Sequence, residues 1–196
     1  MTSDGIRPAT ARDAASIASL HAQSISVGFL VLLGERFLEL LYRRVARGDR
    51  SFVFVHDDPS GKVDGFVAVA EDTGRLYREF MVHDGIRAAL EAAPAVLRHP
   101  WKVIETLRYG IDGGAPTTGA EILATAVASR SRGEGIGRAL VAAAIEEVKR
   151  RGIEHAHVVT AHDNDAAQRA YFACGFRRHA KVEVHRGVVQ EVLVWP

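Results

Sequence analysis

The chain has 196 residues, but it contains one cysteine, few aromatic side chains and almost no net charge. The single cysteine, Cys174, excludes an intramolecular disulfide and a cysteine-rich metal site. Aromatic residues make up 7% of the chain, and the formal net charge is +1. Because a nucleic-acid-binding surface needs a basic patch with stacking aromatic rings, we expect no nucleic-acid partner.

Long apolar runs are missing as well. The longest run, residues 27–34, includes Gly28 and is followed at once by Glu35 and Arg36. A membrane-spanning helix needs about 20 apolar residues, so we expect no membrane span. The first residues lack the basic flank and apolar core of a signal peptide. We therefore expect a cytoplasmic protein that binds no membrane.

The remaining composition is that of an ordinary globular protein. Hydrophobic residues make up 47% and charged residues 25% of the chain, which excludes disordered and low-complexity classes. The length suits one well-buried domain and is short for two. No internal repeat is visible, and neither half beside residues 72–119 would have a whole core. The sequence therefore predicts a single domain, residues 1–196.

Hydrophobic spacing and turn residues predict an α/β fold. In the first part of the chain, we expect a strand at 6–7, a helix capped by Thr10 with Asp13 as its partner, a helix from Gly34 to Gly48, and a hairpin of strands 51–56 and 63–70. After residue 119, we expect a strand at 121–128, a helix at 138–151 and a strand at 155–161. A helix capped by Asp163 and Asn164 then ends at Gly175, and two strands around 186–187 close the chain. The strand–helix–strand unit at 121–161 predicts a parallel pair with a right-handed crossover.

Residues 72–119 are predicted to be a helical insertion. Asp84 is the expected cap of a helix over 85–97, which Pro94 would bend or restart, and Pro100 would begin another helix that runs to about Tyr109. The glycine-rich residues 110–119 are predicted to be a flexible loop. Apolar residues at steps of three or four predict one buried face, formed by Ile86, Leu90, Ala93, Leu97, Trp101 and Ile104.

A glycine- and arginine-rich loop at 130–138 carries the clearest chemical signal. It joins a strand to a helix start, where unpaired backbone N–H groups and the helix dipole favour an anion. Residues 128–151 contain six basic and three acidic residues, a local charge of +3. Gly137 is followed by Arg138 and Ala139, so the loop is not a Walker loop. The step from Gly135 to Gly137 also breaks the dinucleotide fingerprint. The pattern indicates a site for another polyphosphate.

The pattern Arg132-x-x-Gly135-x-Gly137 resembles the coenzyme A pyrophosphate loop of the GNAT acetyltransferase superfamily. Three further segments resemble the same family: Ile6-Arg7-Pro8-Ala9-Thr10 with Asp13-Ala14, Val63-Asp64-Gly65-Phe66, and Asn164-x-x-Ala167-x-x-x-Tyr171-x-x-x-Gly175-Phe176. The resemblance covers nearly the whole chain except residues 72–119. It implies a GNAT-like mixed central sheet of about seven strands flanked by helices, with the helical insertion before the fourth strand.

The resemblance also assigns roles to residues. It implies that the strand end at Thr125, Ala126 and Val127 binds the pantetheine amides, mostly through backbone groups. Asn164 would reach the pantetheine arm, or it would be a plain helix cap, or both. Tyr171 would place its hydroxyl near the thioester sulfur and protonate the leaving thiolate; otherwise it is a core aromatic residue. The pyrophosphate would be bound by Arg132, Gly133, Glu134, Gly135, Ile136, Gly137 and Arg138.

The attacking amine must lose a proton, and Glu121 is the candidate base. It stands fourteen residues before Gly135, where the histone-acetylating branch of the family has its base. Strand alternation predicts that it shares a face with Leu123, Thr125 and Val127. Alternatively, Glu121 is a strand-edge residue paired with an arginine, and His83, Glu71 or a water chain takes the proton.

The resemblance implies an N-acetyltransferase that moves the acetyl group of acetyl-CoA directly to a primary amine of a small molecule or peptide. The backbone N–H of Val127 is the expected oxyanion donor. No metal is expected, because His155, His157 and His162 lack partners at zinc-like spacing. Two other functions remain open, a non-catalytic acyl-CoA-binding sensor and a nucleotide-binding regulatory domain. A homodimer is possible, and the insertion could line the acceptor pocket or form the dimer contact.

Overall fold

The computed structural model describes residues 5–25, 29–98, 119–185 and 188–196, and its elements confirm the mixed α/β prediction. In chain order they are β1 (Ile6–Pro8), α1 (Ala14–Ser24), α2 (Phe29–Leu32), α3 (Glu35–Arg47), β2 (Ser51–Asp57), β3 (Val63–Ala70), α4 (Thr73–Arg98), β4 (Ala120–Val127), the 3-10 turn η1 (Ser129–Ser131), α6 (Ile136–Arg150), β5 (Ala156–Ala161), α7 (Asp165–Ala173), β6 (Arg177–His185) and β7 (Val188–Trp195).

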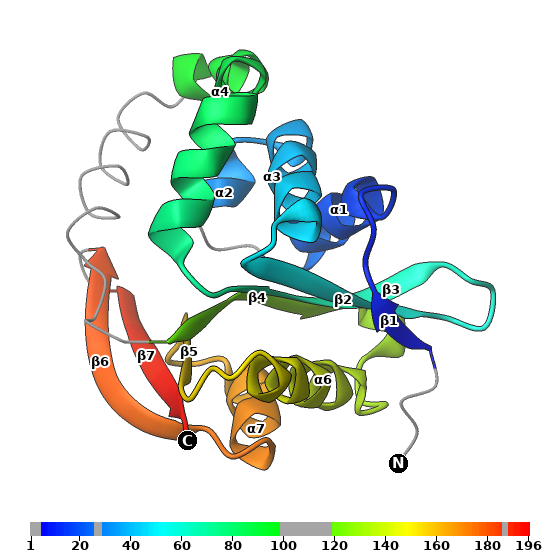
Figure 1. Ribbon diagram of the computed structural model, residues 1–196, viewed down its shortest axis with the longest axis vertical. Helices are drawn as coiled ribbons and strands as arrows, with labels where there is room; N and C mark the ends of the chain where they lie inside the picture. Colours follow the sequence, from blue (N-terminus) through cyan, green and yellow to red (C-terminus); the bar gives the residue numbers. More distant parts are fainter. Residues whose placement is uncertain (1–4, 26–28, 99–118, 186–187) are drawn as a thin grey trace.

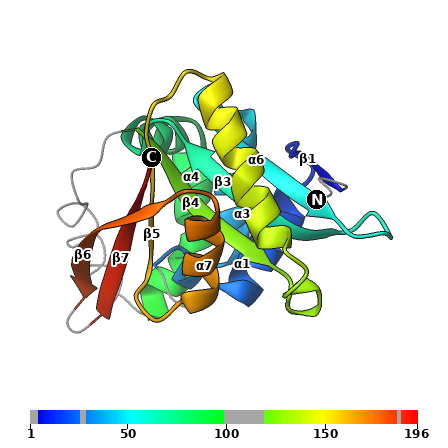
Figure 2. The same ribbon diagram turned by 90° about the horizontal axis from the view of Figure 1, so that it is seen from below.

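The strands form one seven-stranded sheet in the order β1-β2-β3-β4-β5-β7-β6. Neighbouring strands are antiparallel except β4 and β5, which are the expected parallel pair joined through α6. Helices α1, α3 and α4 lie on one face of this sheet, and α6 and α7 lie on the other (Figure 1). Seen from below, α6 and α7 lie next to each other over the sheet (Figure 2).

Two hydrophobic clusters hold the helices to the two faces. The cluster on the α1, α3 and α4 side includes Ile17, Leu38 and Phe66, and the cluster on the α6 and α7 side includes Leu140 and Leu193. All five of these side chains are fully buried. Removing such surface from water is the main stabilising term of a fold, so the sheet is anchored independently on each face.

The start of α1 differs from the prediction. The N-cap residue is Asp13 and not Thr10, since the helix begins at Ala14, but Asp13 is the hydrogen-bond partner of Thr10 as predicted. The Asp13 carboxylate accepts hydrogen bonds from the Thr10 backbone N–H at 2.7 Å and from Arg7 at 2.9 Å. The Arg7 guanidinium lowers the pKa of Asp13 well below its usual range. Arg7 also pairs with Asp57 on β2, so this cap ties α1 to the sheet.

Helix α4 differs more. It begins at Thr73, because the Asp72 carboxylate accepts a hydrogen bond from the Arg75 N–H at 2.8 Å. Asp84, the predicted cap, lies inside the helix and forms an ion pair with Arg44 of α3 at 2.7 Å. Pro94 also lies within the helix. The predicted helix from Pro100 and the loop at 110–118 lie outside the described residues.

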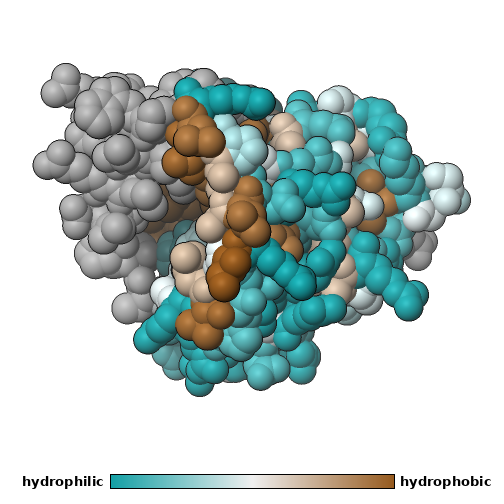
Figure 3. Space-filling view, turned by 90° about the horizontal axis from the view of Figure 1, so that it is seen from above, coloured by the Kyte–Doolittle hydropathy of each residue, from teal (hydrophilic) through white to brown (hydrophobic). Residues whose placement is uncertain are grey.

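The buried face of α4 was also predicted wrongly. The residues that pack inward are Leu76, Phe80, Ala88 and Ala92. By contrast, Ile86 is 84% exposed and Leu97 is 82% exposed, and Leu90 is exposed with them. These residues form an exposed apolar stripe along α4 (Figure 3), in which Leu90 also borders a pocket between α4 and α3. Trp101 and Ile104 of the predicted face lie outside the described residues. Periodicity had found a true apolar face, but the neighbouring helix contacts the opposite one.

Candidate active site

The sheet opens between its two parallel strands. Pairs join β4 to β5 only at Ala120–Ala156, Glu121–His157 and Ile122–Val158. Over residues 123–127, the described part of the chain provides no strand partner on the β5 side of β4, although β3 pairs with its other side. An unpaired strand edge presents backbone N–H and C=O groups. The opening can therefore accept an extended ligand that carries amide groups.

The backbone of β4 alternates between this opening and β3. The N–H of Ala128 donates to the Asp64 carbonyl of β3 at 2.7 Å. Alternation then directs the backbone groups of Val127 and Thr125 to the opening and those of Ala126 toward β3. The Val127 carbonyl indeed accepts a hydrogen bond from Arg132 Nε at 3.2 Å. Of the three residues predicted to bind pantetheine, Thr125 and Val127 turn their backbone groups to the opening, and Ala126 turns its backbone groups to β3.

A β-bulge in β4 separates the predicted catalytic residues. Ala68 of β3 pairs with Ala124 and Val69 pairs with Ile122, so Leu123 is an extra residue. Glu121 consequently faces α4, where Thr73 Oγ1 donates to its Oε2 at 2.5 Å. Thr125 faces α7 on the other side of the sheet. The prediction that alternation places Glu121 and Thr125 on one face was wrong, because the bulge reverses the alternation.

Tyr171 of α7 lies beside the opening on the face that Thr125 occupies. Its hydroxyl donates to Thr125 Oγ1 at 3.2 Å, and its ring packs against Phe176 at 5.3 Å between centroids. Burial raises the pKa of Tyr171 to about 12. The phenol is therefore protonated at neutral pH and can donate a proton toward the opening.

The glycine loop takes the conformation that an anion site needs. Gly133 and Gly135 have φ of +88° and +84°, in the left-handed region that other residues avoid. Gly135 is the N-cap of α6, and within the described structure no side chain caps this helix. The helix starts at Ile136, two residues earlier than predicted. Its first-turn N–H groups and the positive end of its dipole are thus left for a ligand.

The side chains of the loop divide into two kinds. Arg132, Glu134 and Arg138 are exposed at the surface beside the opening. Ile136 is buried in the α6 and α7 cluster, so only its backbone can meet a ligand. Gly137 has room beside it, since an added Cβ would lie 3.6 Å from Val127 Cγ2. The loop therefore presents backbone N–H groups flanked by two arginines.

Asn164 is the N-cap of α7, as one of the two predictions for it stated. Its Oδ1 accepts a hydrogen bond from the Ala167 N–H at 3.2 Å. This bond uses the carbonyl end of the side chain. A contact between Asn164 and pantetheine stays a prediction.

Glu121 lies in a small polar cluster under α4. Besides Thr73, its Oε2 faces Nε2 of His157, the paired residue on β5, at 4.0 Å. Burial lowers the pKa of His157, and its Nδ1 is buried without a hydrogen-bond partner among the described residues. The charge of Glu121 reaches Tyr77 as well, where burial chiefly raises the pKa to about 12. The predicted alternative, an arginine partner for Glu121, is not found in the described part of the chain.

The other two candidate bases lie elsewhere. His83 is exposed on α4, and its Nδ1 is 2.8 Å from the carbonyl of Glu79. It stands ten residues beyond Thr73, about 15 Å further along the helix axis. Glu71 forms an ion pair with Arg151 at 2.7 Å, and Arg151 in turn stacks over Phe52. Neither residue belongs to the cluster around Glu121.

Sequence reasoning missed Thr73 and His157. The sequence gives His157 no role beyond the rejected metal site with His155 and His162, and the described residues contain no group of three potential metal ligands. His162 instead lies 2.7 Å from Glu191. The only sequence signal for Thr73 is the capping residue before it. Its approach to Glu121 depends on a contact across 48 residues of sequence, which local patterns do not report.

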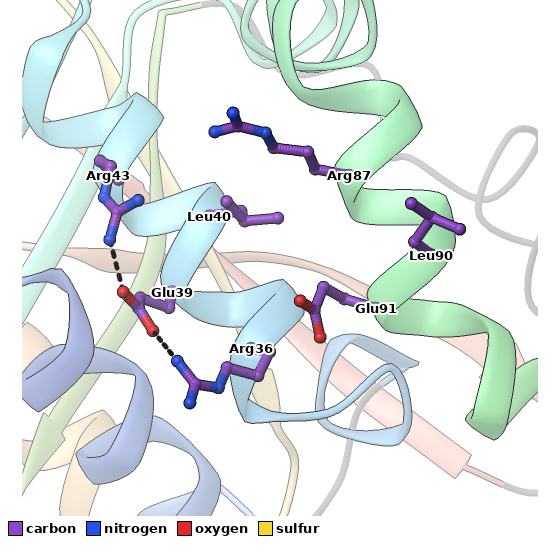
Figure 4. A pocket seen from close by; sticks show the side chains of 7 residues that line it. All are labelled: Arg36, Glu39, Leu40, Arg43, Arg87, Leu90 and Glu91. Atoms are coloured by element: carbon purple, nitrogen blue, oxygen red, sulfur yellow. Dashed lines mark hydrogen bonds and ion pairs between the residues drawn. The ribbon is translucent and has the colours of Figure 1, made fainter.

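A pocket of about 440 Å³ lies away from this site, between α3 and α4 (Figure 4). Glu39 pairs there with Arg36 and Arg43, and Leu40 of the same helix lines the floor. From α4 come Arg87, Leu90 and Glu91. None of the predicted site residues lines this pocket, so it contributes nothing to the candidate active site. Among the described helices, none is both long and apolar enough to cross a membrane.

Comparison with known proteins places the chain in a family. Residues 33–176 match the model of the acetyltransferase (GNAT) family. Among solved structures, a GCN5-related N-acetyltransferase from Kribbella flavida is similar with a TM-score of 0.65 at 19% identity, over 97% of this chain and 96% of that one. A ribosomal-protein-alanine N-acetyltransferase from Brucella melitensis is similar with a TM-score of 0.63 at 18% identity, over 97% and 98%.

The ribosomal-protein-S18-alanine N-acetyltransferase from Escherichia coli is similar with a TM-score of 0.61 at 15% identity, over 97% of this chain and 92% of that one. No curated protein sequence matches the chain. At these identities the solved structures establish the fold, while the family model covers most of the sequence. The chain belongs to the GNAT acetyltransferase family.

Proposed function

We propose that the protein is an N-acetyltransferase that transfers the acetyl group of acetyl-CoA directly to a primary amine. The observation that carries this proposal is the opening between β4 and β5, which has the glycine loop at one end and the Tyr171 hydroxyl beside it. Membership of an acetyltransferase family supports the reaction class. No metal takes part in the proposed reaction.

Coenzyme A would bind on the α6 and α7 side of the opening. The backbone groups of Thr125 and the carbonyl of Val127 would pair with the pantetheine amides, as a further strand would. The backbone from Arg132 to Arg138 and the positive end of α6 would hold the pyrophosphate, with the two arginine side chains adding charge. Asn164 would contact the pantetheine arm through the side-chain amide nitrogen that capping leaves free.

The amine would approach from the α4 side, where Glu121 lies. The opening passes between the two faces of the sheet, so an acceptor on one face can reach an acyl group held on the other. Holding both reactants together supplies the proximity that direct transfer needs. The proposal thus assigns opposite sides of the sheet to the two substrates.

Each bond change then has a residue that serves it. The amine nitrogen forms a bond to the thioester carbonyl carbon, and the Val127 N–H, directed to the opening, stabilises the oxyanion. Glu121 accepts the proton that the amine loses, through water where the two are not in contact. The carbon–sulfur bond breaks, and the Tyr171 hydroxyl donates its proton to the thiolate.

The test is a screen of small amines, polyamines and peptides with acetyl-CoA, with free thiol release as the readout. We expect amine-dependent thiol release well above hydrolysis for at least one class, and an acetylated product by mass spectrometry. Binding of acetyl-CoA without release for any amine would favour the sensor instead. No binding of acetyl-CoA would overturn both functions.

The acceptor stays a proposal at the level of a small-molecule or peptide amine. Three other predictions also stay open, namely the single domain over residues 1–196, the cytoplasmic location and the homodimer. Size-exclusion chromatography with light scattering would test the homodimer. If the apolar stripe of α4 forms the dimer contact, replacing Ile86 or Leu97 by lysine should shift the protein to a monomer in that measurement.

A further inference from the structure

We propose that Asp64 and Gly65 of β3 are positioning residues that fix the two ends of the pyrophosphate loop, so that coenzyme A affinity depends on them. This inference rests on the proposed binding of coenzyme A by residues 132–138. It assigns a role to a buried carboxylate that neither the reaction nor the sequence analysis uses.

Asp64 holds the first end of the loop through two different groups. Its backbone carbonyl accepts a hydrogen bond from the Ala128 N–H at 2.7 Å, at the end of β4. Its carboxylate accepts one from the Ser131 hydroxyl at 2.6 Å, at the end of η1. Both ends of the short turn that leads into the loop are therefore bonded to one residue.

The carboxylate of Asp64 is itself fixed. It is 2% exposed, and its second oxygen lies 2.5 Å from Nδ1 of His56 on β2. Burying a carboxylate is costly unless hydrogen bonds compensate for the lost water. An apolar residue at this position of β3 would avoid that cost. Hydrogen bonds from His56 and Ser131 offset the cost of burying the Asp64 carboxylate, and Ser131 belongs to the turn that leads into the loop.

Gly65 sets the other end. A Cβ built on Gly65 would lie 3.0 Å from Ile136 Cγ2 and 3.0 Å from Leu140 Cδ1. The first two turns of α6 thus rest directly on the backbone of β3, at the residue next to Asp64. A larger side chain would push the N-terminus of α6 away from the sheet, and its N–H groups with it.

Between these anchors lie Arg132 to Gly135, the exposed part of the loop. Two left-handed glycines give this part wide conformational freedom in the absence of restraint. Fixing both ends lowers the entropy that the loop loses when it closes on a ligand. The anchors would therefore improve affinity through preorganisation rather than through contact.

The experiment compares two buried serines. Ser131→Ala removes the bond to Asp64. Its matched control is Ser51→Ala, which removes an equally buried hydroxyl whose bond, 2.8 Å to the Val45 carbonyl, lies far from the loop. Ser131 is 7% exposed and Ser51 is 4% exposed. Coenzyme A affinity is measured by calorimetry, together with Tm and with KM and kcat for acetyl-CoA.

We expect Ser131→Ala to weaken coenzyme A binding about tenfold, because the loop released from Asp64 would have to be ordered at the expense of binding free energy. KM for acetyl-CoA should rise by the same factor, and kcat should stay unchanged. Ser51→Ala should lower Tm as well, by less because its partner is a neutral carbonyl, and should leave the affinity unchanged. Gly65→Ala should weaken binding through the second anchor, and its far-UV circular dichroism would show that it folds.

Two results would overturn the inference, and they differ from failure of the proposed function. If the wild-type protein binds coenzyme A and both Ser131→Ala and Gly65→Ala bind it equally well, the anchors have no positioning role. If Ser51→Ala weakens binding as much as Ser131→Ala, the effect reflects general stability alone. A wild-type protein that binds no coenzyme A overturns the proposed function, and this inference with it.

Discussion

Replacing Tyr171 by phenylalanine removes one oxygen atom from the candidate site and leaves the ring in place. The hydroxyl makes one hydrogen bond, to Thr125 Oγ1 at 3.2 Å, so the free energy of unfolding should fall by about 1 kcal/mol. The catalytic loss should be much larger. Acid assistance to a leaving group is worth about a hundred- to ten-thousand-fold in rate, which corresponds to about 3–5 kcal/mol of barrier.

The matched variant is Thr125→Val, which keeps the shape of the side chain and removes the acceptor of the same bond. Its stability loss should equal that of Tyr171→Phe, while its kcat should fall by less than about tenfold because the phenol is still present. Thiol release at saturating amine and acetyl-CoA measures kcat for both variants. A Tyr171→Phe enzyme with wild-type kcat, or a Thr125→Val enzyme that is equally impaired, would refute the assignment of Tyr171 as the acid.

Three further predictions follow from the same geometry. Glu121→Gln should lower kcat and flatten the acidic limb of the pH–rate profile, since a base matters most where the amine is protonated; an unaltered profile would remove Glu121 from the reaction. Gly135→Ala should cost about 1 kcal/mol in unfolding experiments because its φ is +84°, whereas Gly137→Ala should cost nothing; equal stabilities would contradict this. Burial lowers the pKa of His21 to about 4 from 6.5. The imidazole of His21 therefore binds a proton more tightly in the unfolded chain than in the folded one. As a result, the free energy of unfolding should fall as the pH drops from about 6.5 to 4. His21→Gln should reduce that fall, and an unchanged pH dependence would disprove the linkage.

Local patterns predicted the parts of the site that depend on neighbouring residues in sequence. The glycine-rich turn before α6, the cap at Asn164 and the parallel strands on either side of α6 all follow from short-range spacing. The first two are a turn and a helix end, where one residue type satisfies one backbone requirement. The parallel pair follows from the order strand, helix, strand. For the same reason, the glycine loop could be placed before the helix at 138–151 before the fold was known.

Features that depend on distant residues could not be predicted in this way. The bulge at Leu123 exists because of the register with β3, and it moves Glu121 to the other face of the sheet from Thr125. The exposure of Ile86 and Leu97 depends on which side of α4 meets α3. Periodicity identifies an apolar face, but it does not identify what covers that face.

The surroundings of Glu121, the candidate base, could not be predicted from local sequence patterns either. Thr73 and His157 meet Glu121 from elements 48 and 36 residues away in sequence, through the end of α4 and the pairing of β5. Asp64 is an acidic residue within a strand whose other side chains are mostly apolar, and only the structure shows its bond to Ser131. A buried polar residue in such a strand is therefore a sequence signal worth testing in other chains.

The most direct test of the central claim is calorimetric titration of the wild-type protein and Gly137→Val with coenzyme A. Gly137 has no left-handed φ, and an added Cβ would lie 3.6 Å from Val127 Cγ2, an ordinary contact distance, so the variant should fold and place a side chain beside the expected path of the pyrophosphate. The account predicts one-to-one binding by the wild type, at least tenfold weaker binding by Gly137→Val, and a similar Tm for both free proteins. Equal affinity of the two proteins for coenzyme A would contradict it.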